Sequence, residues 1–504
     1  MRREILIDAA TPETRVALLE DGVLTEVFIE RPTGRGISGN IYKGRVANVL
    51  PGMQAAFVDI GTGRDAFLYV NDLASGIDEE EPPDEEGERL PPIAEPAEPA
   101  RIEDRLKEGQ EIVVQVAKNP VPEKGARLTT VVSLPGRLLV YLPGLPQVGV
   151  SRKIEEPAER ARLEQLAAGV VRDLCLPGGL IVRTAGEGRG ADELLADARF
   201  LAGAWDEVRR RAESASPPAL LHQETGAVVK VLRDLLSDDV QQVLVDGEAV
   251  FGEAVDFVTR VDPSLVPRIR RHAGRESLFG ERGVEQELER ALRPRVWLKS
   301  GGSIVIQSTE ALVAVDVNTG KYVGSRRLEE TVLKTNLEAV AEIVRQIRLR
   351  DLGGIIVIDF IDMEEQASKD EVLQALRTEM RKDRSRSRTL QLSEFGLVEI
   401  TRQRTKPSLE RLLCQPCPAC SGSGRMKSAE SVVFEILREI HRLGPLRAGA
   451  LIVARVHPDL ATFLEQERSG LLEAAGVTIP GGIEVAADPS LRHGQFGLTI
   501  REPD

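Results

Sequence analysis

Two stretches of the chain have apolar residues in patterns that predict regular structure. Within residues 39–70 the runs NIYKGRVANV, MQAAFVDIG and DAFLYV are short, strand-like and separated by glycines, which is typical of a small barrel. Within residues 302–362 the strand-like runs SIVIQS and ALVAVDVN precede a helical repeat of apolar residues, and the apolar run IIVIDFIDM follows it. The second pattern predicts a strand–helix–strand unit whose flanking strands are parallel, with the last strand of the buried kind found in parallel sheets.

Phe57 and Phe67 are out of phase with the core of the predicted barrel. Successive side chains of a strand point to opposite faces, so the aliphatic residues of AAFVDIG and DAFLYV share one face and the phenylalanines take the other. With Lys43, Arg45 and Arg64 nearby, the two rings resemble the platform on which an OB-fold barrel stacks unpaired bases. The alternative is that both rings pack beneath a loop or a neighbouring domain. The run EIVVQVAK is expected to be the last strand of this barrel.

Two aspartates end the parallel strands of the predicted strand–helix–strand unit. Asp316 and Asp359 each fall at the carboxyl end of a strand, which is where ligands bind in open α/β sheets. Two carboxylates at one edge form a hard-oxygen site suited to Mg²⁺, which can activate water and offset charge on a phosphodiester. Asn318 lies on the same side of its strand as Asp316 and could orient that carboxylate or a substrate. Asp362 is either a third ligand or a turn residue.

Two further stretches have residues suited to phosphate. In LIVRTAGEGRG, Arg183 and Thr184 follow an apolar strand and precede glycines, so a guanidinium and backbone N–H groups could hold a phosphate. Residues 377–411 hold ten lysines and arginines against five acids, including the candidate RNA contacts Arg402 and Arg404 in TRQRTK. A basic stripe of this kind is compatible with a nucleic-acid channel. Ordinary turns and solvated helix faces have similar compositions, so neither stretch decides the function alone.

The net charge of −14 argues against nucleic-acid binding until its distribution is considered. Residues 76–104 hold twelve acidic residues and two arginines in a proline-rich stretch without periodicity, which predicts a disordered surface loop. The rest of the chain is therefore close to neutral. The N-terminus lacks the apolar core of a secretory signal, and no run reaches the roughly 18 apolar residues of a membrane span. Together with a length of 504 residues, these features predict a cytoplasmic protein of several domains.

Half of a structural zinc site is visible in the sequence. Cys414, Cys417 and Cys420 lie in CQPCPAC, whereas a tetrahedral site normally takes two cysteine pairs. The fourth cysteine, Cys175, lies in the apolar stretch VVRDLCLPGGLIV and is expected to be a core thiol. The clustering favours metal binding in a reducing compartment over disulfides. The histidines show no metal-ligand spacing and are expected to be surface or core residues; they occupy positions 222, 272, 441, 457 and 493.

Long collinear blocks of the sequence resemble the bacterial ribonuclease E/G family. The blocks are SGGSIVIQSTEALVAVDVN, RLRDLGGIIVIDFIDM, FGLVEITRQRTKPSL and CPACSGSG, and the likeness begins at REILIDAA and runs over nearly the whole chain. The chain ends soon after the cysteine motif and a small domain, without the long scaffold tail of ribonuclease E. The likeness is therefore greater to the ribonuclease G type of the family.

The resemblance implies a multidomain α/β architecture. An RNase H-like fold, catalytically unused, would carry an inserted OB-fold RNA-binding barrel and a 5′-phosphate sensor. It would be followed by a deoxyribonuclease-I-like α/β catalytic domain, a zinc-link and a small C-terminal domain. The expected boundaries are 1–35 and 218–291 for the RNase H-like fold, 36–130 for the barrel with its acidic loop 76–104, 131–217 for the sensor, 292–412 for the catalytic domain, 413–424 for the zinc-link and 425–504 for the C-terminal domain.

The resemblance also implies roles for individual residues. Asp316 and Asp359 would be ligands of a catalytic Mg²⁺, with Asn318 as the supporting amide. Phe57, Phe67 and Lys124 would clamp RNA, and Arg183 and Thr184 would form the 5′-phosphate sensor. Cys417 and Cys420 would form half of a Zn²⁺ site shared with a second chain. A site shared by two chains would have four ligands, of which each chain supplies two. Cys414 has no implied role.

The implied function is an Mg²⁺-dependent endoribonuclease that cleaves single-stranded RNA, favours a 5′-monophosphate, and leaves 5′-phosphate and 3′-hydroxyl ends. It would process ribosomal and transfer RNA and degrade messenger RNA as a homodimer or homotetramer linked by Zn²⁺. Two alternatives stay open: a non-catalytic scaffold that binds single-stranded RNA or 5′ ends, and a nuclease of single-stranded DNA. The acidic insertion, residues 76–104, either shields or modulates the RNA-binding barrel, or has no effect on it.

Overall fold

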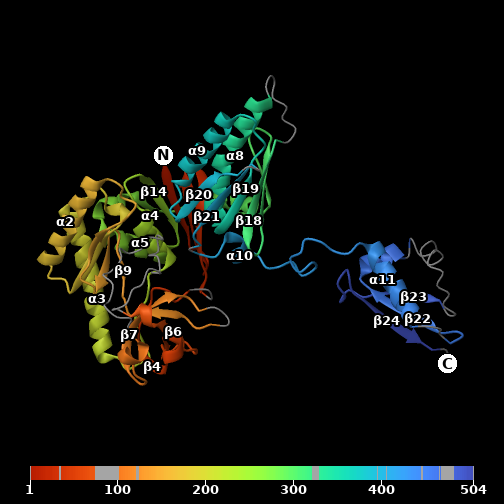
Figure 1. Ribbon diagram of the computed structural model, residues 1–504, viewed down its shortest axis with the longest axis horizontal. Helices are drawn as coiled ribbons and strands as arrows, with labels where there is room; N and C mark the ends of the chain where they lie inside the picture. The colour runs from red at the N-terminus through yellow and green to blue at the C-terminus, as the bar shows by residue number, and fades with distance from the viewer. Residues whose placement is uncertain are drawn as a thin grey trace. The chain divides into compact units, whose positions relative to one another are not determined.

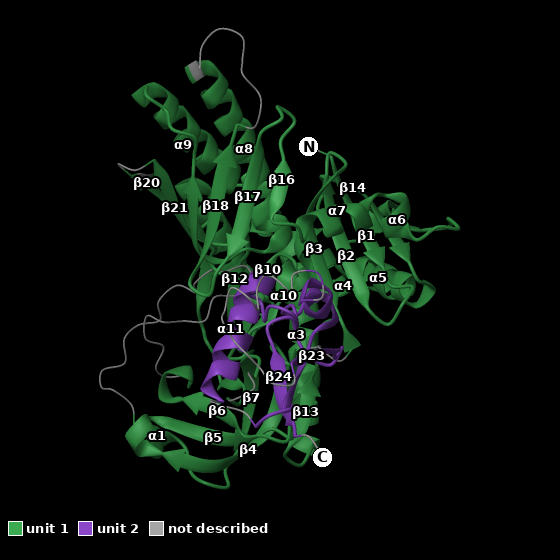
Figure 2. Ribbon diagram, turned by 90° about the vertical axis from the view of Figure 1, so that its right-hand side faces the viewer, with its two compact units in different colours: residues 1–412 green, residues 413–504 purple. Residues whose placement is uncertain are grey.

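The described part of the chain forms two compact units, residues 1–412 and 413–504 (Figure 2). Among the described residues, no helix is both long and apolar enough to cross a membrane. Most of the acidic insertion lies outside the described residues, so its disorder stays a prediction. The structure is a computed structural model, and it describes residues 2–32, 36–73, 101–120, 124–319, 328–393, 396–404, 406–443, 447–464, 466 and 482–502.

A five-stranded sheet brings the N-terminus together with residues 240–271. The strand order is β15-β14-β1-β2-β3, with β1 parallel to β14 and Ile5 opposite Val243. Aliphatic residues of these strands and of α4 and α5 share one hydrophobic core, so the sheet cannot form without both segments. The bounds are β1 Arg3–Asp8, β2 Thr14–Glu20, β3 Val23–Glu30, α4 Ala227–Leu235, β14 Val240–Asp246, α5 Glu248–Val261, β15 Ile269–Arg271, α6 Leu278–Glu281 and α7 Val284–Ala291.

A closed five-stranded barrel confirms the barrel predicted from residues 39–70. The order is β4-β5-β6-β8-β7, and the pairing of β7 with β4 closes the barrel. The strand β13 pairs with the first residues of β4. The run EIVVQVAK forms β7 but is not the last strand. The prediction missed β8, because three residues are too few to show a periodicity. The bounds are β4 Ile41–Leu50, β5 Ala55–Asp59, β6 Ala66–Tyr69, α1 Ile102–Arg105, β7 Glu111–Lys118, β8 Arg127–Thr129 and β13 Ala219–His222.

Residues 134–214 form a four-stranded sheet, with the order β11-β12-β10-β9, whose hydrophobic side chains share a core with α2 and α3. Cys175 follows α2 in a left-handed turn with a φ of 47° and is exposed, so the expectation of a core thiol was wrong. The apolar neighbours that suggested burial belong to the helix before it and the strand after it. The bounds are β9 Leu134–Pro135, β10 Leu139–Pro143, β11 Val148–Val150, α2 Pro157–Asp173, β12 Gly178–Val182 and α3 Ala191–Ser214.

A six-stranded sheet, with the order β16-β17-β18-β19-β21-β20, contains the predicted strand–helix–strand unit. The strands β18 and β19 are parallel, as predicted, and α8 and α9 lie together along one face of the sheet (Figure 1). The bounds are β16 Arg295–Trp297, β17 Ser303–Ser308, β18 Leu312–Asn318, α8 Leu328–Arg350, β19 Gly354–Asp359, α9 Gln366–Met380, β20 Ser387–Leu392, β21 Leu397–Arg402 and α10 Leu409–Leu413.

The expectation that β19 is a fully buried strand was wrong. Ile356 and Ile358 are buried in the core with the helices, but Ile355 on the other face is 48% exposed. The reason lies in the next strand. β20, which follows α9, is parallel to β19 and lies on the side of β19 away from β18, so two right-handed crossovers in the same direction place α8 and α9 on the same face. This sheet is therefore covered by helices on one side.

Helix α8 joins the six-stranded sheet to the N-terminal sheet. Arg348 is buried, and its guanidinium bonds to Glu20 and Glu26 of the N-terminal sheet at 2.8 Å each. Burial opposes ionisation of Glu26, but Arg384 and Arg348 outweigh it and lower the Glu26 pKa to about 2. These charged hydrogen bonds hold α8, and with it the strands that α8 connects, in a defined position.

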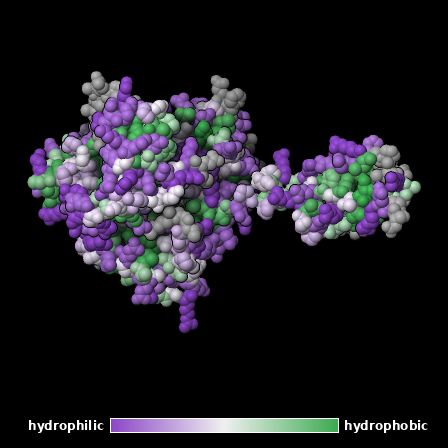
Figure 3. Space-filling view, turned by 90° about the horizontal axis from the view of Figure 1, so that it is seen from below, coloured by the Kyte–Doolittle hydropathy of each residue, from purple (hydrophilic) through white to green (hydrophobic). Residues whose placement is uncertain are grey.

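The smaller unit has its own hydrophobic core beneath a three-stranded sheet. The order is β23-β22-β24, with β22 parallel to β23 and antiparallel to β24. Aliphatic residues of α11 pack against these strands. On the visible face of the smaller unit, hydrophobic residues gather in the middle and hydrophilic residues surround them (Figure 3). The bounds are α11 Ala429–Arg442, β22 Leu451–Val456, β23 Ile483–Ala487 and β24 Phe496–Arg501.

Candidate active site

Asp316 and Asp359 lie directly opposite one another at the ends of β18 and β19. Their neighbours Val317 and Ile358 point into the core, so the alternation of side chains turns both carboxylates to the face that the helices leave open. Both aspartates are exposed. Neighbouring strands are about 4.8 Å apart, so the two side chains are close enough to bind one cation. The predicted strand-end pair is thus brought together by the parallel register.

The carboxylates carry negative charge that the described residues do not neutralise. Burial raises the pKa of Asp359, and the charges of Asp316 and Asp362 raise it further. Asn318 donates a hydrogen bond of 2.7 Å from Nδ2 to Asp316 Oδ2, which leaves Oδ1 available. Among the described residues no lysine, arginine or histidine forms an ion pair with these aspartates. Hard oxygen ligands with excess negative charge at an open edge fit Mg²⁺, which keeps several of its own waters.

A row of aromatic rings lies on the outer face of the barrel. Phe57 and Phe67 are paired across β5 and β6, with ring centroids 5.4 Å apart and planes at 74°. Tyr69 extends the row, with its centroid 4.2 Å from that of Phe67, and is 40% exposed. The residues between them, such as Leu68, are buried in the barrel. Tyr69 was not predicted as a site residue, although the same alternation that turns Phe67 outward applies to it.

Lys124 precedes β8, the strand that pairs with β6. Arg127 of β8 lies opposite Phe67, and the Phe67 N–H donates to the Ala126 carbonyl at 2.7 Å. Lys124 is exposed and lies three residues before Arg127. Arg127 itself lies over the Tyr69 ring, with its guanidinium carbon 5.3 Å from the centroid. Arg127 therefore borders the aromatic row at this edge.

Arg183 and Thr184 occupy the predicted turn but differ in their surroundings. Arg183 is 2% exposed and donates to the Gly136 carbonyl and, at 2.8 Å, to Asp234 Oδ1. Burial opposes ionisation of Asp234, but Arg233 and Arg183 lower its pKa to about 2. Thr184 is half-buried, and its hydroxyl is 3.1 Å from the Ser151 hydroxyl. Arg183 therefore fixes the turn to α4, and Thr184 is the nearer of the two to the surface.

Arg402 and Arg404 also have different environments. Arg402 is buried; Nε bonds to Asp383 at 2.6 Å, and Nη1 bonds to Asp351 at 2.7 Å. This buried network gives Arg402 a structural role, since it ties the end of α8 to the segment before β20. Arg404 is exposed and donates from Nε to the Gly353 carbonyl at 3.0 Å. Of the two arginines, Arg404 is the one available to RNA.

The cysteine motif places two thiols together. The backbone N–H groups of Gly424 and Gly422 lower the pKa of the Cys420 thiol, and a hydrogen bond from Cys417 contributes. The thiolate is the form that binds zinc, so this turn suits a zinc site. Among the described residues of one chain, no third histidine, cysteine or carboxylate ligand joins this pair. Cys414 is exposed like Cys417. The motif therefore remains half of a tetrahedral site.

Known proteins match the chain over its full length. The model of the Ribonuclease E/G family matches residues 133–405, and that of the RNase E/G thioredoxin-like domain matches residues 416–500. Ribonuclease G of Haemophilus influenzae is 41% identical over 498 residues, which cover 99% of both chains. Ribonuclease G of Escherichia coli K12 is 39% identical over 500 residues, covering 99% of this chain and all of the relative. Ribonuclease E of Escherichia coli K12 is 38% identical over 476 residues, which cover 94% of this chain and 43% of the relative.

The family matches span the elements that form the candidate site. The family model covers β18, α8 and β19, and the thioredoxin-like match covers the smaller unit. The full-length identity to ribonuclease G also includes the barrel that precedes the family match. The chain belongs to the ribonuclease E/G family.

Proposed function

We propose that this endoribonuclease depends on Mg²⁺, cleaves single-stranded RNA with a preference for a 5′-monophosphate, and leaves 5′-phosphate and 3′-hydroxyl ends. The observation that carries the proposal is the register of Asp316 against Asp359, which gathers two carboxylates at one open strand edge. The membership of the ribonuclease E/G family supports the assignment of RNA as the substrate. By this proposal the chain acts in the processing of ribosomal and transfer RNA and in the decay of messenger RNA.

The residues of the chain have separable tasks in this reaction. When bound by Asp316 and Asp359, Mg²⁺ supplies an activated water and offsets charge on the phosphodiester. Asn318 fixes Asp316 through Oδ2, so Oδ1 is presented in one orientation. The charge of Asp362 adds to the negative field at Asp359 and favours a bound cation. The aromatic row of the barrel holds unpaired bases by stacking, which suits a single strand and excludes a duplex.

A cleavage assay on a fluorescent single-stranded RNA, with Mg²⁺ or with a chelator, tests the proposal. Cleavage of the RNA that needs Mg²⁺, with the single-stranded DNA of the same sequence intact, supports it. Binding without cleavage would favour the alternative of a non-catalytic scaffold. Equal cleavage of the DNA would show that the protein is a general single-strand nuclease.

The aromatic row makes a prediction about affinity. Phe57→Ala and Phe67→Ala are each expected to weaken RNA binding about tenfold, because stacking contributes roughly 1–3 kcal/mol per base. Fluorescence anisotropy of a labelled RNA, measured with a chelator so that no cleavage occurs, gives the affinity. The control is Phe200→Ala, which removes an exposed phenylalanine of α3, 37% exposed and far from the barrel in sequence. If both barrel variants bind as tightly as Phe200→Ala, the rings do not contact RNA.

The 5′-end preference makes a second prediction. Thr184→Val is expected to lower cleavage of a 5′-monophosphorylated RNA about tenfold and to leave the 5′-hydroxyl RNA unaffected, because a hydrogen bond to a charged group contributes roughly 1.5–3 kcal/mol. The ratio of the two cleavage rates is the measurement. Thr259→Val is the control, because the Thr259 hydroxyl bonds only within its own helix, to the Val255 carbonyl at 2.7 Å. An unchanged ratio would remove Thr184 from the proposed sensor. Arg183 is less suitable, since its loss would leave Asp234 buried without this partner.

The proposal includes assembly through zinc. Cys417 and Cys420 of two chains would share one Zn²⁺, giving a homodimer or a homotetramer. The adjacent thiols and the lowered pKa of Cys420 support this assignment. All four cysteines are unpaired, which is compatible with the proposed cytoplasmic location.

A further inference from the structure

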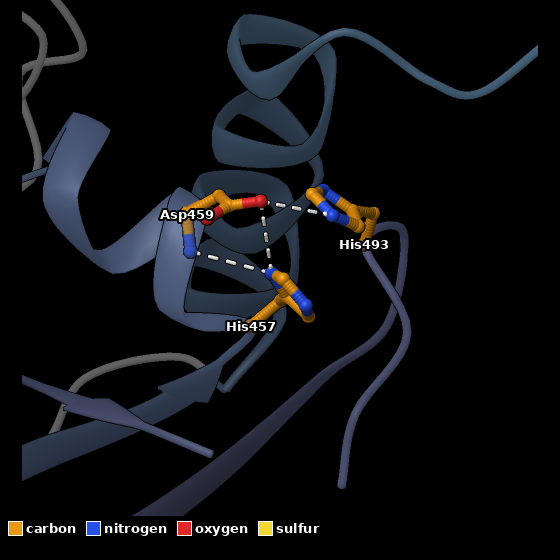
Figure 4. A group of neighbouring side chains, drawn as sticks. All are labelled: His457, Asp459 and His493. Carbon is orange, nitrogen blue, oxygen red and sulfur yellow. Dashed lines mark hydrogen bonds and ion pairs between the residues drawn. The ribbon is translucent and has the colours of Figure 1, made fainter. Parts of the chain in front are cut away.

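Two histidines and an aspartate meet at one end of the sheet in the smaller unit. The sequence shows no metal-ligand spacing for its histidines, yet the fold brings His457 and His493 together with Asp459 (Figure 4). Among the described residues, this is the one place where three such ligand atoms all lie within 4.8 Å of one another. The spacing along the chain gave no sign of this cluster, because the two histidines are 36 positions apart.

The distances between the ligand atoms fit a single small cation. Asp459 Oδ2 is 3.0 Å from His493 Nε2 and 3.6 Å from His457 Nδ1. Ligands at the usual 2.0–2.1 Å from a tetrahedral Zn²⁺ are about 3.3 Å from one another, which lies between these two distances. In Figure 4 both rings turn a nitrogen toward the Asp459 carboxylate, and both nitrogens approach the same oxygen.

The fold defines the positions of all three residues. His457 directly follows β22, whose last residue, Val456, is opposite the last residue of β23 and the first of β24. Residues 458–464 are helical, and the His457 carbonyl accepts from the N–H groups of Leu460 and Ala461 at 3.0 Å each. The helix therefore begins at the strand end and carries Asp459 in its first turn.

The loop that carries His493 is held by its own hydrogen bonds. The Asp488 N–H donates to the Val456 carbonyl at 2.8 Å, so this bond holds the first residue of the loop beside the end of β22. Ser490 donates to Asp488 Oδ1 from its N–H at 2.9 Å and from its hydroxyl at 2.6 Å. The Gln495 N–H donates to the Arg492 carbonyl at 2.9 Å, which closes the turn around His493. The ligands thus come from a helix start and a closed loop rather than from free chain ends.

We propose that His457, Asp459 and His493 bind a late first-row divalent transition-metal ion, with Zn²⁺ as the probe. Two imidazoles and one carboxylate suit Zn²⁺, Co²⁺ or Ni²⁺, whereas Mg²⁺ prefers oxygen ligands alone. The side chains of His457, His493 and Asp459 are 22%, 35% and 71% exposed, so water can complete the coordination. This site is separate in its chemistry from the cysteine pair, because it contains no thiol, and from the strand-end aspartates, because it contains nitrogen donors.

Binding requires a local rearrangement. The two rings are stacked, with centroids 3.8 Å apart and planes at 28°, and they must tilt apart for both lone pairs to point at one ion. The weak hydrogen bond of 3.3 Å from the Asp459 N–H to His457 Nδ1 is replaced by the metal. The positive end of the helix disfavours a cation, and the Asp459 carboxylate offsets this effect. The bound ion would connect the end of β22 to the loop before β24.

Zinc binding by the full-length Cys417→Ser/Cys420→Ser protein tests the proposal without the thiol pair. Equilibrium dialysis against Zn²⁺ followed by elemental analysis is expected to give one zinc per chain. Adding His457→Gln and His493→Gln should remove that zinc, and adding His441→Gln, an exposed histidine of α11, should leave it. Equal zinc in the His457/His493 variant and the His441 variant would overturn the proposal.

Further measurements distinguish loss of the metal site from a folding defect in the variants. Thermal unfolding without metal should give the same midpoint for the His441 and the His457/His493 proteins, and only the first should gain stability when Zn²⁺ is added. Asp459→Asn keeps the shape of the ligand and both imidazoles, so it should weaken zinc binding at least tenfold without unfolding the unit. In the imidazole NMR spectrum, Zn²⁺ should shift the signals of two of the five histidines. Equal shifts at all five would indicate surface binding only and contradict a defined site.

Discussion

Asp316→Asn is expected to lower the rate of RNA cleavage by about 10³-fold while RNA affinity stays unchanged. The substitution keeps the size of the side chain and its place at the end of β18 but removes the charge that binds the cation. Electrostatic stabilisation by a bound metal contributes several kcal/mol, and each 1.4 kcal/mol is about tenfold in rate. Single-turnover cleavage of a fluorescent RNA at saturating protein measures the chemical step, and anisotropy with a chelator measures binding.

The matched control is Glu310→Gln. Glu310 is an exposed acid in the turn between β17 and β18, at the opposite end of the strand that carries Asp316. The Glu310→Gln protein should cleave RNA at the rate of the unaltered protein. Asp359→Asn should lower the cleavage rate as Asp316→Asn does, because the two aspartates are opposite in register. Full activity in either aspartate variant would show that the strand-end pair is not the metal site.

Cys417→Ser/Cys420→Ser is expected to dissociate the proposed zinc-linked oligomer into monomers. One chain offers two adjacent thiols, and a tetrahedral zinc needs four ligands, so the loss of both removes every protein ligand of a shared ion. Native mass spectrometry measures the number of chains and of zinc ions per particle. A strong chelator should give the same monomers from the unaltered protein, because serine substitution and zinc removal eliminate the same link.

Two single variants are the controls for the thiol pair. Cys175→Ser changes an exposed thiol in the turn after α2, and Cys414→Ser changes the nearest cysteine outside the pair. Both are expected to keep the oligomer and its shared zinc. An intact oligomer in Cys417→Ser/Cys420→Ser would show that other contacts join the chains. Dissociation by Cys414→Ser would make Cys414 a member of the link.

The alternation along single strands was sufficient to predict several features of the fold and the site. The outward phase of Phe57 and Phe67 is visible within a few residues, because the side-chain period of a strand is two. The parallel pairing of β18 with β19 follows from the helix between them, and it leads to the register of Asp316 against Asp359. Local patterns succeeded where the property in question depends on neighbours in the chain.

Properties that depend on distant partners were not predictable in this way. Arg402 and Arg404 are two residues apart in one basic run, yet the first is buried between Asp351 and Asp383 and the second is exposed. Ile355 lies in an apolar run but is exposed, because both covering helices pack on the other face of β19. Burial is decided by what the fold places against a side chain, and an apolar or charged run does not specify it.

The amino-acid sequence alone determined the family resemblance, four of the five barrel strands, the outward aromatic rings and the two strand-end aspartates, because each is written in consecutive residues or in a short repeat. Tertiary structure alone decided that Arg183 is held by Asp234, that Cys175 is exposed, and that His457 and His493 form a cluster with Asp459. The two histidines are 36 positions apart and share no pattern. They meet because β22 and β24 are antiparallel neighbours, and side chains beyond paired strand ends become close only when the sheet has formed.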